Sequence, residues 1–142
     1  MSKLLTVFVK TFLNLALITL SMPSYGDIEA TFEGRSAKLN LVVSNTYETR
    51  RKGLMHQTLL GRNSGMIFIW PSNKNHCMWM KNTSLPLSVA YLSADGIILE
   101  IYDMVPFSEE SICSIKKARM AVEVNRGWFY ENQIIVGDRI NF

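Results

Sequence analysis

The stretch from His76 to Thr83, HCMWMKNT, places imidazole, thiol, thioether, amine and amide groups within eight residues. Thioether and imidazole groups suit copper(I), so a soft-ligand copper site is one hypothesis for this chain. Its candidate ligands are His56, His76, Cys77, Met55, Met66, Met78 and Met80. Methionine is also an ordinary gap filler in hydrophobic cores, and core packing is the favoured interpretation. No metal site or cofactor is therefore predicted, and copper binding ranks third among the functional hypotheses.

Polar residues also interrupt strands that are otherwise apolar. A lysine or glutamate in such a strand must reach solvent, find a partner or shift its pKa. The simplest interpretation is that Lys81 and Glu123 face water or pair across strands. The alternative is that Lys81, Asn82 and Glu123 converge on a shallow pocket that holds a polar ligand. The candidate ligand-binding residues are Lys81, Asn82, Thr83, Glu123 and Asp103.

Recognisable catalytic motifs are absent from the sequence. It has no Gly-x-Ser-x-Gly elbow, no His-Glu-x-x-His pair, no phosphate loop and no dinucleotide-binding glycine pattern. Cys77 could act as a nucleophile only as a free thiolate. An envelope hydrolase or transferase working through Lys81 and Glu123 is therefore the second hypothesis, and no catalytic residue is identified.

Cys77 and Cys113 are the cysteines of the chain. In an oxidising compartment two cysteines are expected to form one disulfide. Two buried free thiols are the alternative, because unpaired cysteine is often fully buried.

Secretion is suggested by residues 1–26. Lys3 and Lys10 precede an apolar run that ends before Pro23, as in a secretory signal peptide. The run is short for a membrane span, which needs about 20 apolar residues, although an uncleaved anchor is the rival interpretation. Residues 27–142 are then predicted to form a single exported domain, periplasmic or secreted, with no membrane span after cleavage.

Removing this segment changes the charge. The chain has 15 Lys+Arg and 12 Asp+Glu; the segment holds two lysines and no acid, so 13 basic and 12 acidic residues remain, a net charge of +1. A nucleic-acid-binding domain is expected to carry a basic stripe. The runs at 50–52 and 116–119 are better interpreted as solvated faces, so no nucleic-acid partner is predicted.

Short strands are predicted to position the candidate ligand-binding residues. Alternation and turn residues predict hairpins over 27–32 with 37–43 and over 89–92 with 97–101, the second around Asp95-Gly96. Further strands are predicted at 65–70, ended by Pro71, at 76–82, at 118–124 and near the end of 134–142.

Helical signals are few. Asn45 as N-cap with Glu48 predicts a helix over 46–52 that stops at Gly53. A turn or short helix is expected over 56–60, and one helical turn over 128–133. The fold class is therefore α+β and mostly β, a small antiparallel barrel-like sheet with one or two short helices.

The cluster Trp128-Phe129-Tyr130 follows Gly127 at a predicted turn. Aromatic side chains at a turn can bind sugars or partner proteins. Packing of at least two of the three rings at one end of a barrel is the favoured interpretation.

An ordered series of motifs resembles the domain-of-unknown-function family 192, from about Ala37 to Ile140. The motifs are Arg51-x-Gly53-Leu54-Met55, Leu59, Gly65-Met66-Ile67-Phe68, Trp79-Met80-Lys81-Asn82-Thr83, Pro86-Leu87, Val122-Glu123-Val124-Asn125-x-Gly127 and Gly137-Asp138. The chain departs from the family pattern at Ser88, where an aspartate is common, and at His56, where a basic residue is usual. The resemblance implies a small β-rich fold, often exported, and no established reaction.

The leading hypothesis is an exported, non-catalytic binding or interaction module with a polar site near the WMKNT segment. Its partner is expected to be a small polar ligand or a component of the cell envelope.

Overall fold

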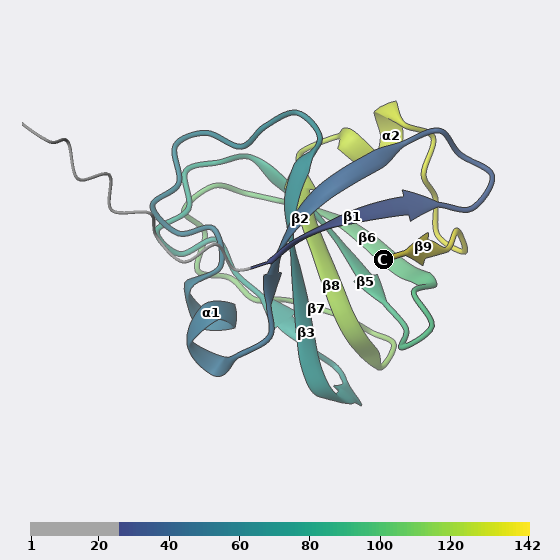
Figure 1. Cartoon of the computed structure of the whole chain (residues 1–142). Helices are drawn as coiled ribbons and strands as arrows, with labels where there is room; N and C mark the ends of the chain where they lie inside the picture. Colours follow the sequence, from purple (N-terminus) through teal and green to yellow (C-terminus); the bar gives the residue numbers. More distant parts are fainter. Residues whose placement is uncertain (1–25) are drawn as a thin grey trace, which may run out of the picture.

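The fold is built on a mixed seven-stranded sheet that curls into a half-barrel (Figure 1). A computed structural model describes residues 26–142, and the predicted signal segment lies outside them apart from Gly26. The strands are β1 (Asp27–Phe32), β2 (Lys38–Ser44), β3 (Ser64–Lys74), β4 (Cys77–Met78), β5 (Leu87–Leu92), β6 (Ile98–Met104), β7 (Ile112–Cys113), β8 (Ala118–Asn125) and β9 (Ile140–Asn141), with helices α1 (Tyr47–Lys52) and α2 (Trp128–Glu131). The mostly β prediction is confirmed. Within residues 26–142, no helix has the length and apolar character needed to cross a membrane.

The strand order is β6-β5-β8-β3-β2-β1-β9. Every neighbouring pair is antiparallel except β2 and β3, which run parallel. A parallel pair needs a long crossover connection, and the segment 45–63 that contains α1 provides it. The prediction of an antiparallel sheet is therefore wrong at this one pair. The crossover also places α1 beside the sheet, where it matters for the site.

One end of the half-barrel is closed by backbone hydrogen bonds between the β5–β6 turn and the segment that leads into β9. Ile140 donates to the carbonyl oxygen of Gly96 at 2.9 Å, and Ile98 donates to that of Asp138 at 2.9 Å. Because β9 also pairs with β1 at Phe32, the turn at 93–96 connects the two ends of the sheet. The predicted Asp95-Gly96 hairpin is thus confirmed and has a second role in closure.

Replacing Gly96 with alanine tests this closure. Gly96 has φ +78°, and a Cβ added there would collide with the backbone oxygen of Ile140. Left-handed backbone alone costs a non-glycine residue about 1–2 kcal/mol. We expect Gly96→Ala to lose more stability in urea unfolding than the control Gly34→Ala, where φ is +70° and no atom lies within 4 Å of the added carbon. Equal losses would show that the contact with Ile140 is unimportant.

A first hydrophobic core fills the inside of the curled sheet. Alternate residues of β2 and β8, including Leu39, Leu41 and Val122, point into it. Trp128 and Phe129 of α2 close one end, whereas Tyr130 is 89% exposed. Packing of two of the three aromatic rings is confirmed.

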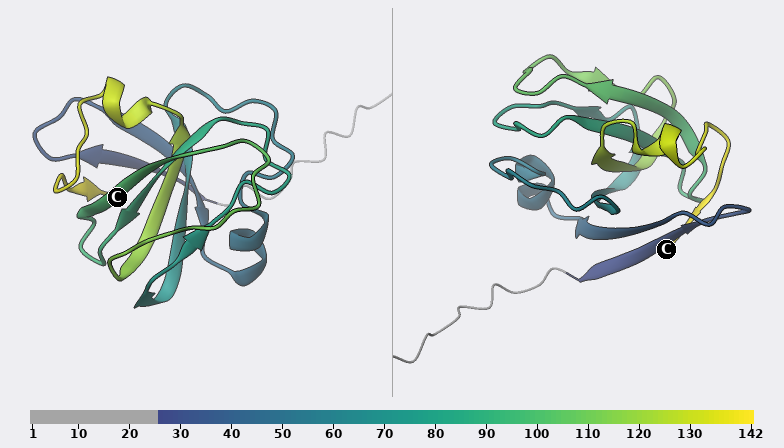
Figure 2. Two further views of the ribbon diagram at one scale, coloured as in Figure 1. Left: turned by 180° about the vertical axis from the view of Figure 1, so that it is seen from behind. Right: turned by 90° about the horizontal axis from the view of Figure 1, so that it is seen from above.

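A second core covers the outer face of β3, β5 and β8. Phe68, Val89 and Ala121 of these strands pack under Leu54, which follows α1, and under Met80, which follows β4. Seen from behind, the segments that lead into and out of the β4–β7 pair cross over the strands of the sheet (Figure 2). The thioethers of Met78 and Met80 are buried here, in line with the core-packing interpretation.

Four local expectations are wrong. The helix cap is Thr46, which forms a capping box with Thr49, so the Asn45–Glu48 box does not form. Residues 57–60 form neither helix nor turn; the turn lies earlier, at 53–56. Strand β3 continues through Pro71 to Lys74. The pairing with β8 is irregular between Ile69 and Lys74, so Pro71 is not required to donate a hydrogen bond to the neighbouring strand. The strand expected over 76–82 is limited to two residues, since its continuation bonds to the loop at Ser108 instead.

Candidate functional site

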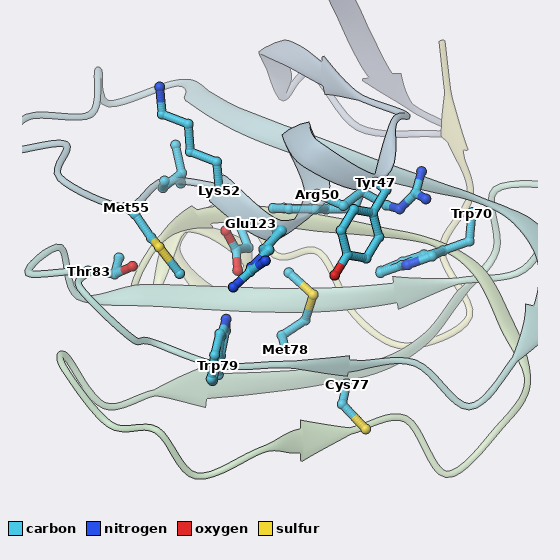
Figure 3. Close-up of a pocket in the computed structure, with 14 residues that line it drawn as sticks. Tyr47, Arg50, Lys52, Met55, Trp70, Cys77, Met78, Trp79, Thr83 and Glu123 are labelled. Atoms are coloured by element: carbon cyan, nitrogen blue, oxygen red, sulfur yellow. The ribbon is translucent and has the colours of Figure 1, made fainter.

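A cavity of about 280 Å³ lies between α1 and the outer face of the sheet (Figure 3). We call it the inner cavity. Helix α1 and the turn after it provide Tyr47, Arg50, Arg51, Lys52, Gly53, Leu54 and Met55; the sheet provides Phe68, Trp70 and Glu123; β4 and the segment after it provide Cys77, Met78, Trp79 and Thr83. Three parts of the chain that are far apart in sequence therefore enclose one space.

Helix α1 is fixed above the sheet by its cap and by one arginine. Thr46 Oγ1 accepts from the Thr49 amide at 3.1 Å, which satisfies a free N–H of the first turn. The Arg50 guanidinium donates to the carbonyl oxygens of Asn45 at 2.6 Å and Ile69 at 2.9 Å. Arg50 thus links the helix to β3, and its charge is already engaged with the backbone.

Glu123 lies at the floor of the inner cavity. It is opposite Met66 on β3 and Val89 on β5, and its neighbours Val122 and Val124 point into the first core. Alternation therefore directs Glu123 to the outer face, where the second core covers it and leaves it 3% exposed. Burial raises the pKa of Glu123 to about 8. Its carboxyl group is therefore mostly protonated at neutral pH.

A neutral carboxyl group can donate one hydrogen bond and accept others. No hydrogen-bond partner or ion pair for the Glu123 side chain occurs among residues 26–142, and burial is the sole cause of its raised pKa. Figure 3 shows its carboxyl group among the side chains that line the cavity. Ser44 Oγ is the enclosed side-chain polar atom that lacks a partner within residues 26–142, whereas the Glu123 side chain lines the inner cavity. Glu123 is therefore available to a molecule that enters the cavity.

An outer cavity of about 460 Å³ adjoins the inner one. The two share Tyr47, Arg51, Lys52, Met55 and Trp79 as lining residues, and the outer cavity adds Glu48, His56, Lys81 and Asn82. Lys81 Nζ lies 3.4 Å from Glu109 Oε1 and 5.2 Å from the centre of the Trp79 ring. Lys81 is thus held at the surface by a carboxylate and an aromatic face.

The five predicted ligand-binding residues occupy three places. Glu123 and Thr83 line the inner cavity, where the Thr83 hydroxyl donates to the Lys81 carbonyl at 3.0 Å. Lys81 and Asn82 line the outer cavity, and Asn82 has φ +53°. Asp103 lines neither cavity and accepts from the Ser88 hydroxyl at 2.5 Å. Ser88 also accepts from the Gly127 amide at 3.0 Å, so this pair fixes the turn before α2.

The predicted disulfide between Cys77 and Cys113 is present and joins β4 to β7. Because its sulfur is oxidised, Cys77 is not a thiolate nucleophile or a copper ligand in this state. His76 beside it stacks on Trp70 with ring centres 4.0 Å apart, and burial lowers its pKa. Within the described part of the chain, no three His, Cys, Asp or Glu side chains lie close enough together to hold a metal ion.

Sequence reasoning missed the upper half of the site. Arg51 and Lys52 are exposed, as predicted for a solvated face, but they also line the cavity. The sequence gives no signal for the part of Tyr47 in the site. The available signal was the position of the basic run in a short helix between two strands, because such a connection must pass across a sheet face.

Comparisons with known proteins identify the family and leave the activity open. The family model DUF192, described as "Uncharacterized ACR", matches residues 28–142. A crystal structure from Sinorhizobium meliloti 1021, described as that of a candidate transcription regulator, is 30% identical, with a TM-score of 0.80 over 83% of this chain and 95% of that one. A protein of unknown function from Novosphingobium aromaticivorans DSM 12444 is 27% identical, with a TM-score of 0.77 over 82% and 85%. None of the curated proteins matches the chain.

Proposed function

This chain belongs to the DUF192 family of uncharacterised proteins, and we propose that it is a non-catalytic binding module that holds a small polar ligand in the inner cavity. The observation that carries the proposal is Glu123. A carboxyl group without a partner under a hydrophobic layer does not stabilise the folded protein. A ligand that forms a hydrogen bond with it would be stabilised by that bond. Buried groups with strongly shifted pKa values cluster at functional sites.

The shape and lining of the cavity support binding. Its volume is just below the usual range for small-molecule sites, which suits a small ligand. Apolar rings and thioethers surround a few polar groups, as is usual in such sites. Catalysis through Lys81 and Glu123 has weaker support, because the two side chains line different cavities and Lys81 pairs with Glu109. Copper binding has weaker support as well, since the thiol of Cys77 is in a disulfide.

We also propose that the protein is exported, to the periplasm or beyond. Structural disulfides persist in oxidising compartments and are rare in the cytosol. The Cys77–Cys113 bond and the signal-like composition of residues 1–26 support the same compartment.

A thermal-shift screen with sugars, peptidoglycan fragments, nucleotides and metal ions tests the binding function. We expect one ligand class to raise the melting temperature, since a ligand that binds only the folded state stabilises it. The shift should disappear in Glu123→Leu, which removes the polar group at similar size. It should remain in Glu110→Leu, an exposed glutamate outside both cavities. A shift that survives Glu123→Leu and Trp79→Ala would place the ligand elsewhere and contradict the proposal.

A further inference from the structure

Building on the proposed binding function, we infer that the ligand is an organic anion, a carboxylate or phosphate group on an apolar body. Its charged group binds between Arg51 and Glu123, and Glu123 takes part as a neutral hydrogen-bond donor. Its body lies against the aromatic wall of the inner cavity.

The charge of the inner cavity is the first argument. Three basic residues line it, and Glu123 is the one acidic residue among its lining residues. Arg50 is engaged with backbone carbonyls, but no ion pair involves Arg51 or Lys52 within residues 26–142. Figure 3 shows the Lys52 ammonium directed away from the cavity, so the Arg51 guanidinium is the group that can meet an anion there. A guanidinium group is a partner that carboxylate and phosphate groups prefer.

The protonation of Glu123 is the second argument. Arg50, Arg51 and Lys52 from α1 line the same cavity, but none of them lowers the pKa of Glu123. Tyr91 from β5 lies close enough for the charge of Glu123 to raise its pKa, and β3 places Met66 opposite Glu123. The Tyr91 hydroxyl donates to the Ile112 carbonyl at 2.6 Å, so its proton is not donated to Glu123. Burial keeps the carboxyl group neutral at neutral pH. A neutral acid offers an anion a hydrogen bond, whereas a carboxylate there would repel it.

The walls of the cavity are the third argument, because they indicate an apolar body. Trp70 and Met78 form the inner wall, and Tyr47 and Trp79 flank the opening that leads to the outer cavity. Figure 3 shows these four side chains around the same space. Tyr47 is 67% exposed and Trp79 is 39% exposed, so a ring or alkyl chain that covers them removes apolar surface from water.

Four small probes of similar shape separate the charge classes. Benzoate and phenyl phosphate carry an anion, benzamide is neutral and benzylamine is a cation. We expect the two anions to bind the protein at pH 7 at least about tenfold more tightly than benzamide, since a hydrogen bond to a charged group contributes about 1.5–3 kcal/mol. Benzylamine should bind most weakly. Binding is measured by titration calorimetry, and its place by NMR shifts of the Trp70 and Trp79 indoles.

Two arginine variants test the role of Arg51. Arg51→Gln should weaken benzoate binding by about tenfold or more. Arg62→Gln is the matched control, because Arg62 is exposed and lines neither cavity. Equal affinity in both variants would overturn the assignment of Arg51 to the anion.

The pH dependence tests Glu123 separately. Benzoate keeps the same charge from pH 6 to 9, so a loss of its affinity in this range reports on the protein. Phenyl phosphate is used only above pH 7, because its second ionisation lies near pH 6. We expect affinity to fall as Glu123 ionises, and we expect Glu123→Gln to bind at pH 7 with a smaller loss above it. A profile that is the same in wild type and Glu123→Gln would overturn the hydrogen bond from the neutral acid.

The outcomes distinguish the two proposals. If benzamide or benzylamine binds at least as tightly as benzoate and shifts the Trp79 indole, the binding function stands and the anion inference fails. If no probe shifts the cavity tryptophans at millimolar concentration, both fail. Preference for phenyl phosphate over benzoate, or the reverse, identifies which anionic group the cavity favours.

Discussion

Replacing Glu123 with glutamine is expected to stabilise the protein, and the gain should grow as the pH rises from 5 to 8. The usual pKa of a glutamate is 4.5, and burial raises that of Glu123 to about 8 in the folded protein. Between these values the folded state retains a proton that the unfolded state has released. The free energy of unfolding of the wild type therefore falls as the pH rises through this window and levels off above it.

Glutamine removes this titration and keeps the size and polarity of the side chain. The difference in unfolding free energy between Glu123→Gln and wild type should be small below pH 5 and reach a few kcal/mol at pH 9, since each pKa unit corresponds to about 1.4 kcal/mol. Urea unfolding at several pH values measures it, with the exposed Glu110→Gln as control. A difference that stays constant from pH 5 to 9 would show that Glu123 ionises normally, with water or a cation reaching it.

Loss of the disulfide is the second large effect. Replacing Cys77 and Cys113 together with serine is expected to lower the free energy of unfolding by about 4 kcal/mol on the chain-entropy model, for two cysteines 36 residues apart. Both side chains are exposed, so serine introduces no buried polar group. The bond also holds the β4–β7 layer over the second core, and its loss should loosen the lower wall of the inner cavity.

The measurement compares unfolding with and without dithiothreitol. Wild type should lose stability on reduction, whereas the double serine variant should be unaffected and match the reduced wild type. A wild type that keeps its full stability when alkylation shows both thiols to be free would contradict the expected contribution of the bond.

The elements that the sequence predicted well are those whose signals are local. The Asp95-Gly96 hairpin, the apolar run at 65–70 and the alternating strand at 118–124 each depend on neighbouring residues. The disulfide was predicted from the presence of two cysteines, without knowledge of their places in the fold. The parallel pairing of β2 with β3 was missed since it depends on where a crossover lies, which no short pattern reports.

The candidate site was half predicted for a related reason. Alternation correctly separates Glu123 from Val122 and Val124, and the usual inference is that such a residue faces water. It is buried here because irregular segments, 79–86 and 105–111, cover the outer face of the sheet. Their path is set by contacts such as Met80 with Ser108 and Phe107 with Thr83, which join distant parts of the chain. The prediction that Lys81 and Glu123 converge on one pocket did not include these covering segments.

The pairing order of the sheet also has a kinetic consequence. Of the strand pairs, β1–β2 and β5–β6 are adjacent in sequence, whereas β3–β8, β5–β8 and β1–β9 join strands separated by large parts of the chain. Such nonlocal pairing places a domain among slow folders, on the order of milliseconds to seconds. The hairpins β1–β2 and β5–β6 can form early, because each joins neighbouring segments. The end of the half-barrel closes last, because β1 pairs with β9 and Gly96 bonds to Ile140 only when the end of the chain is in place. Until then, the free edge of β1 is open to pairing with other chains.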